Sequence, residues 1–345
     1  MPQGMTLSQA RIIDPILSTM SIGVETQEYV MSLAFPSIFC PKRAVNIINY
    51  GQKESKYLYT TRRAPGSNIN RVSIGYGDSK VTLVQDAIES EITYEMLEES
   101  NNIVDLQTMS VAQVKRILAH RLEYDQAALL GSFSLYASTN RLALSGSNQF
   151  SDPTSPIENL FDAAKAAVLR GCNRLPNTMI FGSIDVYNAI KRHPYFKNQF
   201  NRSSAVNITA QLIASSLDIQ KYGISTATWI DPANPSVETA MLGSKLWIGY
   251  VPGNGEADLQ SNSNSQGGGL SAFNPIQGAS NTKASFGYTY LREQAQAGGQ
   301  GLGVGIMPAY EDKNARTWYI QGVTDRIPAL TGLNCGYLFD NVIAA

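Results

Sequence analysis

The clearest pattern along the chain is a long stretch of helical periodicity. Between Ser110 and Gly131, apolar residues recur at spacings of three, four or seven: Val111, Val114, Leu118, Leu122 and Leu129. At 1.5 Å per residue, this stretch predicts one helix about 30 Å long with a single apolar stripe. We therefore expect residues 110–131 to form a structural spine on which other elements pack.

The residues after this helix alternate between helical and strand patterns. A second helix is predicted to begin at a capping box, with Ser155 as N-cap, Pro156 as first helical residue and Glu158 three residues after the cap, and to end at Gly171. The next segments predict a buried strand over 177–181 and a helix that Ser183 caps and Pro194 ends. We also expect a helix over 209–217 and strands over 224–229, 245–251, 286–290, 316–320 and 335–339.

The first part of the chain carries no pattern of a long element. Residues 1–45 mix short apolar clusters with Pro15, Pro36 and Pro41, which predicts an extended arm. Residues 56–62 and 71–76 are β-branched and aromatic, and the turn residues between them predict a two-stranded hairpin. An isolated hairpin is marginally stable, so we expect it to lie on another surface, such as a neighbouring subunit.

Composition strengthens the expectation of an assembly. Charged residues make up 16% of the chain, against roughly 25% in an ordinary soluble protein. The 17 tyrosines are suited to partner contacts or to strands within one domain, and the composition leaves both readings open. The net charge of −1 gives no sign of a basic surface that would bind a polyanion such as nucleic acid.

The cysteines and the hydropathy pattern bear on the compartment. Cys40, Cys172 and Cys335 lie far apart, are odd in number, and are expected to be reduced core residues. No segment has the pattern of a membrane helix or a secretory leader, so we expect no membrane partner and retention in the compartment of synthesis.

Signals of catalysis are weak throughout the sequence. The two histidines, His120 and His193, accompany no nucleophile motif, and the sequence lacks GxSxG, HExxH and P-loop patterns. The glycines over 298–305 miss the spacing of a dinucleotide loop, and the acidic run 86–99 lacks the order of a calcium loop. We therefore predict a non-enzymatic protein with no catalytic, cofactor or metal site.

The order of these parts resembles a known family. The arm, the hairpin with Thr61–Arg62–Arg63–Ala64–Pro65–Gly66, the acidic segment 89–95, the spine helix and the segments 156–160 and 176–178 are similar to a tailed-phage major capsid protein of the Hong Kong 97 fold. The resemblance covers roughly residues 30–345.

That resemblance implies an α+β fold with four parts. These are an N-terminal arm (1–50), an extended β-hairpin loop (51–85), a peripheral domain with the spine helix (86–154 and 286–315) and an axial domain (155–285 and 316–345). It also implies self-assembly as pentamers and hexamers into an icosahedral shell around double-stranded DNA. The expected location is the virion, after assembly in the host bacterial cytoplasm.

Further partners follow from the same resemblance. Scaffolding, portal and decoration proteins are implied, and packaged DNA would be touched weakly and without sequence specificity. Arg62, Arg63 and Arg71 at the loop tip are the expected interface residues, with Glu89, Glu91 and Glu95 of an adjacent subunit as their partners. Two alternatives stay open here: an encapsulin-type shell, and a soluble ligand-binding protein or enzyme that uses the glycine-rich loops over 253–305.

Overall fold

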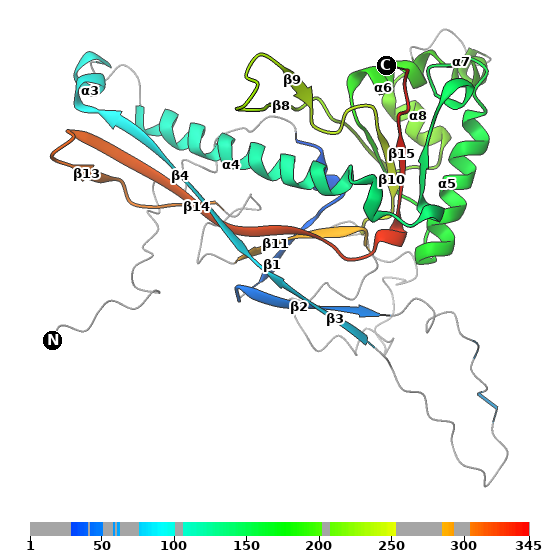
Figure 1. Cartoon of the computed structure of the whole chain (residues 1–345), viewed down its shortest axis with the longest axis horizontal. Helices are drawn as coiled ribbons and strands as arrows, with labels where there is room; N and C mark the ends of the chain where they lie inside the picture. The colour runs from blue at the N-terminus through cyan, green and yellow to red at the C-terminus, as the bar shows by residue number, and fades with distance from the viewer. Residues whose placement is uncertain are drawn as a thin grey trace, which may run out of the picture.

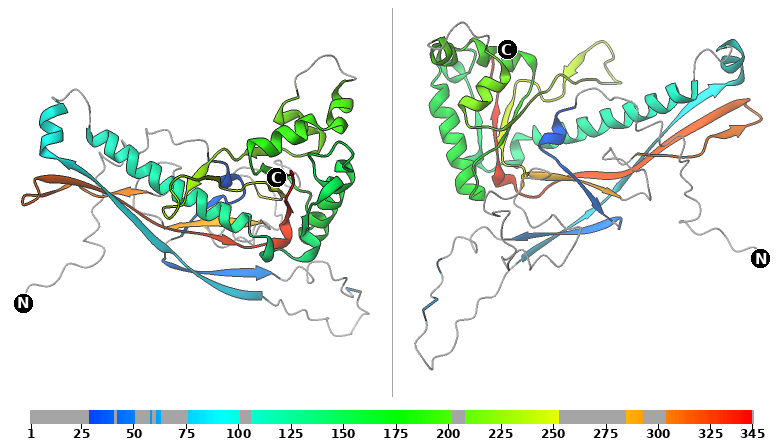
Figure 2. Two further views of the ribbon diagram at one scale, coloured as in Figure 1. Left: turned by 45° about the horizontal axis from the view of Figure 1, so that its top comes forward. Right: turned by 180° about the vertical axis from the view of Figure 1, so that it is seen from behind.

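The computed structural model describes residues 29–40, 42–50, 58, 61–62, 76–100, 106–201, 208–252, 285–292 and 304–344. A compact region of helices around a sheet occupies one end, and a long helix and long strands reach away from it (Figures 1 and 2). The fold mixes α-helix and β-sheet, as the sequence predicts. No helix among these residues has the length and apolarity needed to cross a membrane.

The predicted spine is the longest helix that the structure describes. Helix α4 spans Leu106–Leu130, so it starts four residues earlier than predicted and ends one residue earlier. Val111, Val114 and Leu118 from the predicted stripe are buried against the strands below. The early start has a packing reason, because Leu106 lies against the same apolar cluster.

A six-stranded sheet lies under the spine helix, with β14 (Thr317–Leu330) at its centre. On one edge β14 pairs antiparallel with β11 (Gly287–Arg292), β12 (Gly305–Ile306) and β13 (Tyr310–Asp312). On the other edge it pairs antiparallel with β4 (Val84–Thr93), from Thr317 opposite Thr93 to Arg326 opposite Val84. The first strand, β1 (Ser37–Cys40), runs parallel to β11. The predicted strand over 316–320 is therefore only the first part of β14.

The compact end is built on a five-stranded sheet in the order β5-β15-β10-β6-β7. Its strands are Arg141–Ala143, Gly336–Asp340, Leu246–Gly249, Thr178–Phe181 and Lys221–Ile224. Helices α5 (Ile157–Cys172), α6 (Ile184–Arg192), α7 (Pro194–Asn201) and α8 (Ala210–Ser216) gather around it (Figure 1). The core holds fully buried aromatic side chains, among them Trp247, Phe181, Phe161 and Phe339. The strands predicted over 177–181, 245–251 and 335–339 are confirmed.

The helix ends follow the sequence in two cases. The hydroxyl oxygen of Ser183 accepts the N–H of Val186 at the start of α6, as predicted. The helix ends before Pro194, which opens α7. Thr209 caps α8 in the same way, with its hydroxyl accepting the N–H of Leu212.

The predicted capping box of α5 is wrong. The Ser155 hydroxyl donates to the carbonyl of Asn148, and the N-cap position is Pro156, which makes no side-chain cap bond. The helix ends at Cys172, and its C-cap residue Asn173 has a φ of 59°, in the left-handed region. Gly171 lies inside the helix, where a Cβ atom would be 2.2 Å from the carbonyl oxygen of Asn334. A glycine is needed there for close packing.

A two-stranded ladder that was not predicted flanks the predicted hairpin in the sequence. Strands β2 (Ala44–Tyr50) and β3 (Tyr76–Thr82) pair antiparallel and project from the side of the main sheet away from α4 (Figures 1 and 2). Leu58, Thr61 and Arg62 belong to no strand. The rest of the predicted hairpin, apart from Tyr76, lies outside the described residues.

Residues 29–40 of the predicted arm belong to the core, and residues 1–28 lie outside the described residues. A short 3-10 helix, η1 (Met31–Leu33), precedes β1, and Met31 and Phe35 are fully buried. The smaller elements include helix α3 (Tyr94–Ser100) and a separate ladder of strands β8 (Thr228–Ile230) and β9 (Glu238–Ala240). The predicted strand over 224–229 is therefore divided between the end of β7 and the start of β8.

The three cysteines are buried and form no disulfide, which confirms the prediction of reduced core residues. The glycine-rich segments lie almost wholly outside the described residues, which leave out 253–284 and 293–303.

Candidate assembly surface

Two predicted acidic residues lie on the exposed face of β4. Exposure alternates along this strand, with Glu89 and Glu91 exposed and Ile92 buried against the spine helix. Both carboxylate oxygens of Glu89 accept the hydroxyl of Tyr310 at 3.3 Å. Partial desolvation, and then the Glu89 carboxylate, raise the pKa of Tyr310, so the hydroxyl remains a donor at neutral pH. The acidic face is thus fixed to β13 as well as to β14.

A hollow lies between β4, α3 and α4, and Glu89 and Glu91 are among the residues that line it. Two adjoining cavities of about 540 and 520 Å³ form it, and both are lined by Ser90, Glu91, Met96 and Gln113. We call this hollow the acidic groove. Three large apolar side chains at or next to it are strongly exposed: Met96 at 54%, Met109 at 58% and Ile117 at 40%. Apolar side chains exposed beside a polar rim are typical of a surface that another chain covers.

The structure brings the predicted acidic residues together but not their predicted partners. Glu95 is exposed in the first turn of α3, directly after the strand that carries Glu89 and Glu91. Arg62 is exposed, and Arg63 and Arg71 lie outside the described residues. Within the described residues, no ion pair joins Arg62 to Glu89, Glu91 or Glu95.

A buried ionic network holds the spine helix on the sheet. The Arg326 side chain is 1% exposed, and its Nε lies 3.3 Å from an oxygen of Asp86 on β4. Its guanidinium also donates to the carbonyl of Leu118 on α4. The residue before Arg326 on β14 is Asp325. Its side chain is fully buried and pairs with Arg292 at 3.2 Å and with Arg43 at 3.7 Å. Arg43 lies at the base of β2, so the network also ties the projecting ladder to the main sheet.

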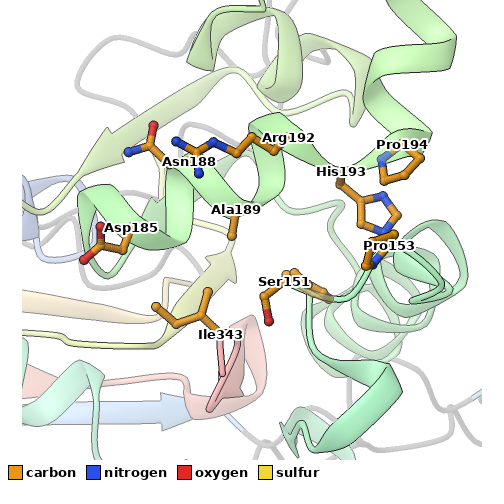
Figure 3. A pocket seen from close by; sticks show the side chains of 10 residues that line it. Ser151, Pro153, Asp185, Asn188, Ala189, Arg192, His193, Pro194 and Ile343 are labelled. Carbon is orange, nitrogen blue, oxygen red and sulfur yellow. The ribbon is translucent and has the colours of Figure 1, made fainter. Parts of the chain in front are cut away.

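The compact end carries an open pocket of about 380 Å³ near the C-terminal strand (Figure 3). Asp185, Asn188 and Arg192 reach it from α6, and Ser151 and Ile343 line the opposite side. His193 lies at its rim, where Nδ1 accepts the N–H of Tyr195 and burial lowers the pKa of the ring. This contact gives the ring a structural role. Within the part of the chain that the structure describes, no group of three or more His, Cys, Asp or Glu residues could hold a metal ion.

Comparison with known proteins gives a consistent result. No family model matches the chain. The major capsid protein of Burkholderia phage BcepMu is 28% identical over 251 residues, which cover 71% of this chain and 78% of the relative. A crystal structure of a phage-related protein from Bordetella bronchiseptica RB50 has a TM-score of 0.74 and 26% identity, covering 98% of this chain and all of that one.

A solved phage capsid has the same fold. The capsid structure of cyanophage P-SCSP1u has a TM-score of 0.54 and 9% identity, and the match covers 98% of this chain and 93% of that one. The long helix over a sheet, the compact sheet-and-helix end and the projecting ladder are thus the parts of a known architecture. The chain is similar to a phage major capsid protein over 71% of its length and has the Hong Kong 97-like fold of phage capsid subunits.

Proposed function

We propose that this chain is the major building block of a tailed-phage head, in which copies arranged as pentamers and hexamers tile an icosahedral shell around double-stranded DNA. The observation that carries the proposal is the similarity to a phage protein named major capsid protein over 71% of the chain. A capsid fold over 98% of the chain supports it.

Each part of the subunit has its own task in this proposal. The extended loop (51–85) reaches over neighbours, the spine helix with the six-stranded sheet, including β14, forms the side of the capsomer, and the compact end with the five-stranded sheet lines its centre. The isolated β2–β3 ladder supports this division, since a two-stranded ladder gains stability when it lies on another surface.

Contacts between subunits pair opposite charges in this proposal. Arg62, Arg63 and Arg71 of one copy approach Glu89, Glu91 and Glu95 of the next, over the acidic groove. The exposed Met96 and Met109 beside the carboxylates would then be covered by the neighbour's loop. Apolar burial would supply most of the affinity, and the charge pairs would select the register of the loop.

The electrostatics suit a container for DNA. The chain has 27 basic and 28 acidic side chains, so a wall of many copies carries little net charge of its own. Such a wall touches packaged DNA weakly and without sequence specificity, because strong binding needs many cationic contacts to phosphates. In this proposal the head assembles in the bacterial cytoplasm with scaffolding and portal proteins, and decoration proteins bind afterwards.

Electron microscopy of the chain expressed alone, combined with the ratio of absorbance at 260 and 280 nm of the sedimenting fraction, tests the proposal. Closed shells, tubes or rings of five or six subunits support it. If only monomers form, the chain is expressed with the other head proteins of its phage. Particles that then form and contain DNA support the proposal. Continued failure to assemble refutes it, and particles that hold a cargo protein without DNA replace it with a compartment function.

A further inference from the structure

Glu123 on the spine helix holds a segment that lies 93 residues earlier in the chain. Its Oε1 accepts the N–H of Val30 at 3.0 Å and the N–H of Met31 at 3.1 Å, and its Oε2 lies 3.3 Å from the same Met31 nitrogen. These amides begin η1, where no helical carbonyl precedes them as an acceptor. The carboxyl group of one helix therefore caps another element.

The site around this carboxyl group is closed and largely apolar. Glu123 is 2% exposed, and Met31, Ala34 and Phe35 on the docked segment are fully buried. The Phe35 ring packs on Phe286, with 5.7 Å between centroids. Among the described residues, none forms an ion pair with Glu123.

Several titratable or charged groups surround the site without reaching Glu123 by a salt bridge. From the docked segment, the buried Tyr29 hydroxyl interacts electrostatically with Glu123 and with Arg116. From α4, the His120 ring lies 6.3 Å from the Tyr29 ring. From β7, which packs on η1 through Gly223, the nearby groups are Lys221 and Tyr222.

An ionised carboxylate in such a site is costly, because burial removes water that two amide bonds replace only in part. Burial accordingly raises the pKa of Glu123 to about 7, while the Met31 and Val30 amides oppose the shift. Once the segment leaves α4, water reaches the carboxyl group and its pKa returns toward the ordinary 4.5. Docking of the segment on α4 is therefore accompanied by uptake of a proton at pH values between 4.5 and about 7. The stabilisation is fully present below pH 4.5 and is lost as the pH rises through 7.

We propose that Tyr29–Phe35 and Glu123 form a proton-linked latch, in which the segment is held on the spine helix more firmly when the carboxyl group is protonated than when it is ionised. The latch follows residues 1–28 directly in the sequence. Proton concentration therefore sets how firmly the root of the N-terminal region is attached to the spine.

Hydrogen exchange of the full chain tests the latch, with protection factors corrected for the intrinsic pH dependence of exchange. From about pH 5.5 to about pH 8.5, linkage predicts a fall on the order of tenfold in protection of the amides of residues 30–35. Strand β6 should not share this fall. Glu123→Gln, which mimics the neutral acid, should keep its protection at both pH values. Glu98→Gln, an exposed carboxylate on α3, should behave like the unmodified chain.

Three outcomes would overturn the latch: no fall in the unmodified chain, the same fall in Glu123→Gln, or an equal fall in β6, which would indicate global unfolding. If Glu123→Gln does not fold, carbon NMR of the unmodified chain labelled at its glutamate carboxyls decides the matter. One carboxyl group titrating near pH 7 supports the latch. Titration of every glutamate below about pH 5.5 refutes it, because exposed glutamates titrate near 4.3.

Discussion

Gly322 of β14 lies directly against Val114 of α4, so closely that a Cβ atom on Gly322 would lie 2.3 Å from Cγ1 of Val114. Leu118 of the same helix and Ile306 of β12 lie just beyond, at 3.3 and 3.6 Å. The spine helix therefore rests on bare backbone at this point. The distance between helix and sheet is set by the absence of one side chain.

Replacement of Gly322 by alanine should push the helix off the sheet. An added methyl group in a packed core costs about 1–3 kcal/mol when neighbours have to shift. We expect Gly322→Ala to lower the free energy of unfolding by that amount in urea denaturation. Val114→Ala removes the clashing methyl groups, so the double variant should lose less than the sum of the two single changes. Strict additivity of the two losses would show that the two residues do not compete for this space.

Loss of the Arg326 side chain on β14 should lower the free energy of unfolding more than loss of a surface charge on the spine helix. Removing one partner of a buried ion pair typically costs 3–5 kcal/mol, because the other charge is left without compensation. Since Asp86 is 30% exposed, we expect Arg326→Leu to lower the free energy of unfolding by about 2–3 kcal/mol. Arg121→Leu is the matched control, because Arg121 is 61% exposed in its pair with Asp125, and should cost under about 1 kcal/mol. Equal losses in the two variants would contradict a special role for the buried pair.

The cap of α6 gives a smaller, local prediction. Ser183→Ala removes the acceptor for the Val186 amide and should cost about 1 kcal/mol in thermal or chemical unfolding. Ser183→Asp keeps an acceptor at the helix start and should retain most of the stability. A loss in Ser183→Asp as large as that in Ser183→Ala would mean that the hydroxyl has another role.

Charge reversal tests the proposed subunit contact. Arg63→Glu should abolish shells in electron microscopy while the far-ultraviolet circular dichroism of the subunit stays unchanged. A second reversal at the true partner, Glu89→Arg, Glu91→Arg or Glu95→Arg, should restore particles. Arg192→Glu, an exposed reversal on α6, serves as control and should assemble normally. Normal particles from Arg63→Glu would remove this residue from the contact.

The sequence was informative wherever a local signal agreed with the packing. The spine stripe, the Ser183 cap and the stop at Pro194 each follow from short-range rules, and all three are present. Ser155 matched the capping-box spacing equally well. The predicted N-cap role is nevertheless wrong, because the Ser155 hydroxyl donates to the carbonyl of Asn148, a contact that the local sequence pattern does not encode.

Strands were predicted less well because their pairing is long-range. Gly322 and Pro328 resemble strand breakers, yet β14 continues through both. Nine consecutive residues beyond Thr317 pair with β4, and Gly322 is needed beneath Val114. The ladder of β2 and β3 was not predicted for a similar reason. Residues 44–50 carry only a weak local strand pattern, and their partner strand is distant in the sequence.

The exposure of the acidic residues at the candidate surface could be predicted in part from the sequence. Alternation along β4 puts Glu89 and Glu91 on one exposed face, as expected for acidic residues of a strand. Glu123 gave no signal, because a glutamate in the middle of a helix is ordinarily solvated. Its burial depends on Val30 and Met31, which pack against it from a distant part of the chain. A buried stripe that also takes in Gln126 and Ala127 shows that the contact face of α4 is wider than the apolar residues alone indicate.

Strands β3 and β4 run from Tyr76 to Thr93 with a single break at Leu83, whose side chain is buried and whose N–H bonds to the carbonyl of Arg43. A pull on the Tyr76 end is therefore carried along one backbone into the ladder between β4 and β14. The load falls on all the hydrogen bonds of that ladder in parallel, as shear, and does not open them one at a time. Tension from a neighbouring molecule that binds the projecting ladder would thus be borne by the ten paired residues of β4 and β14 together.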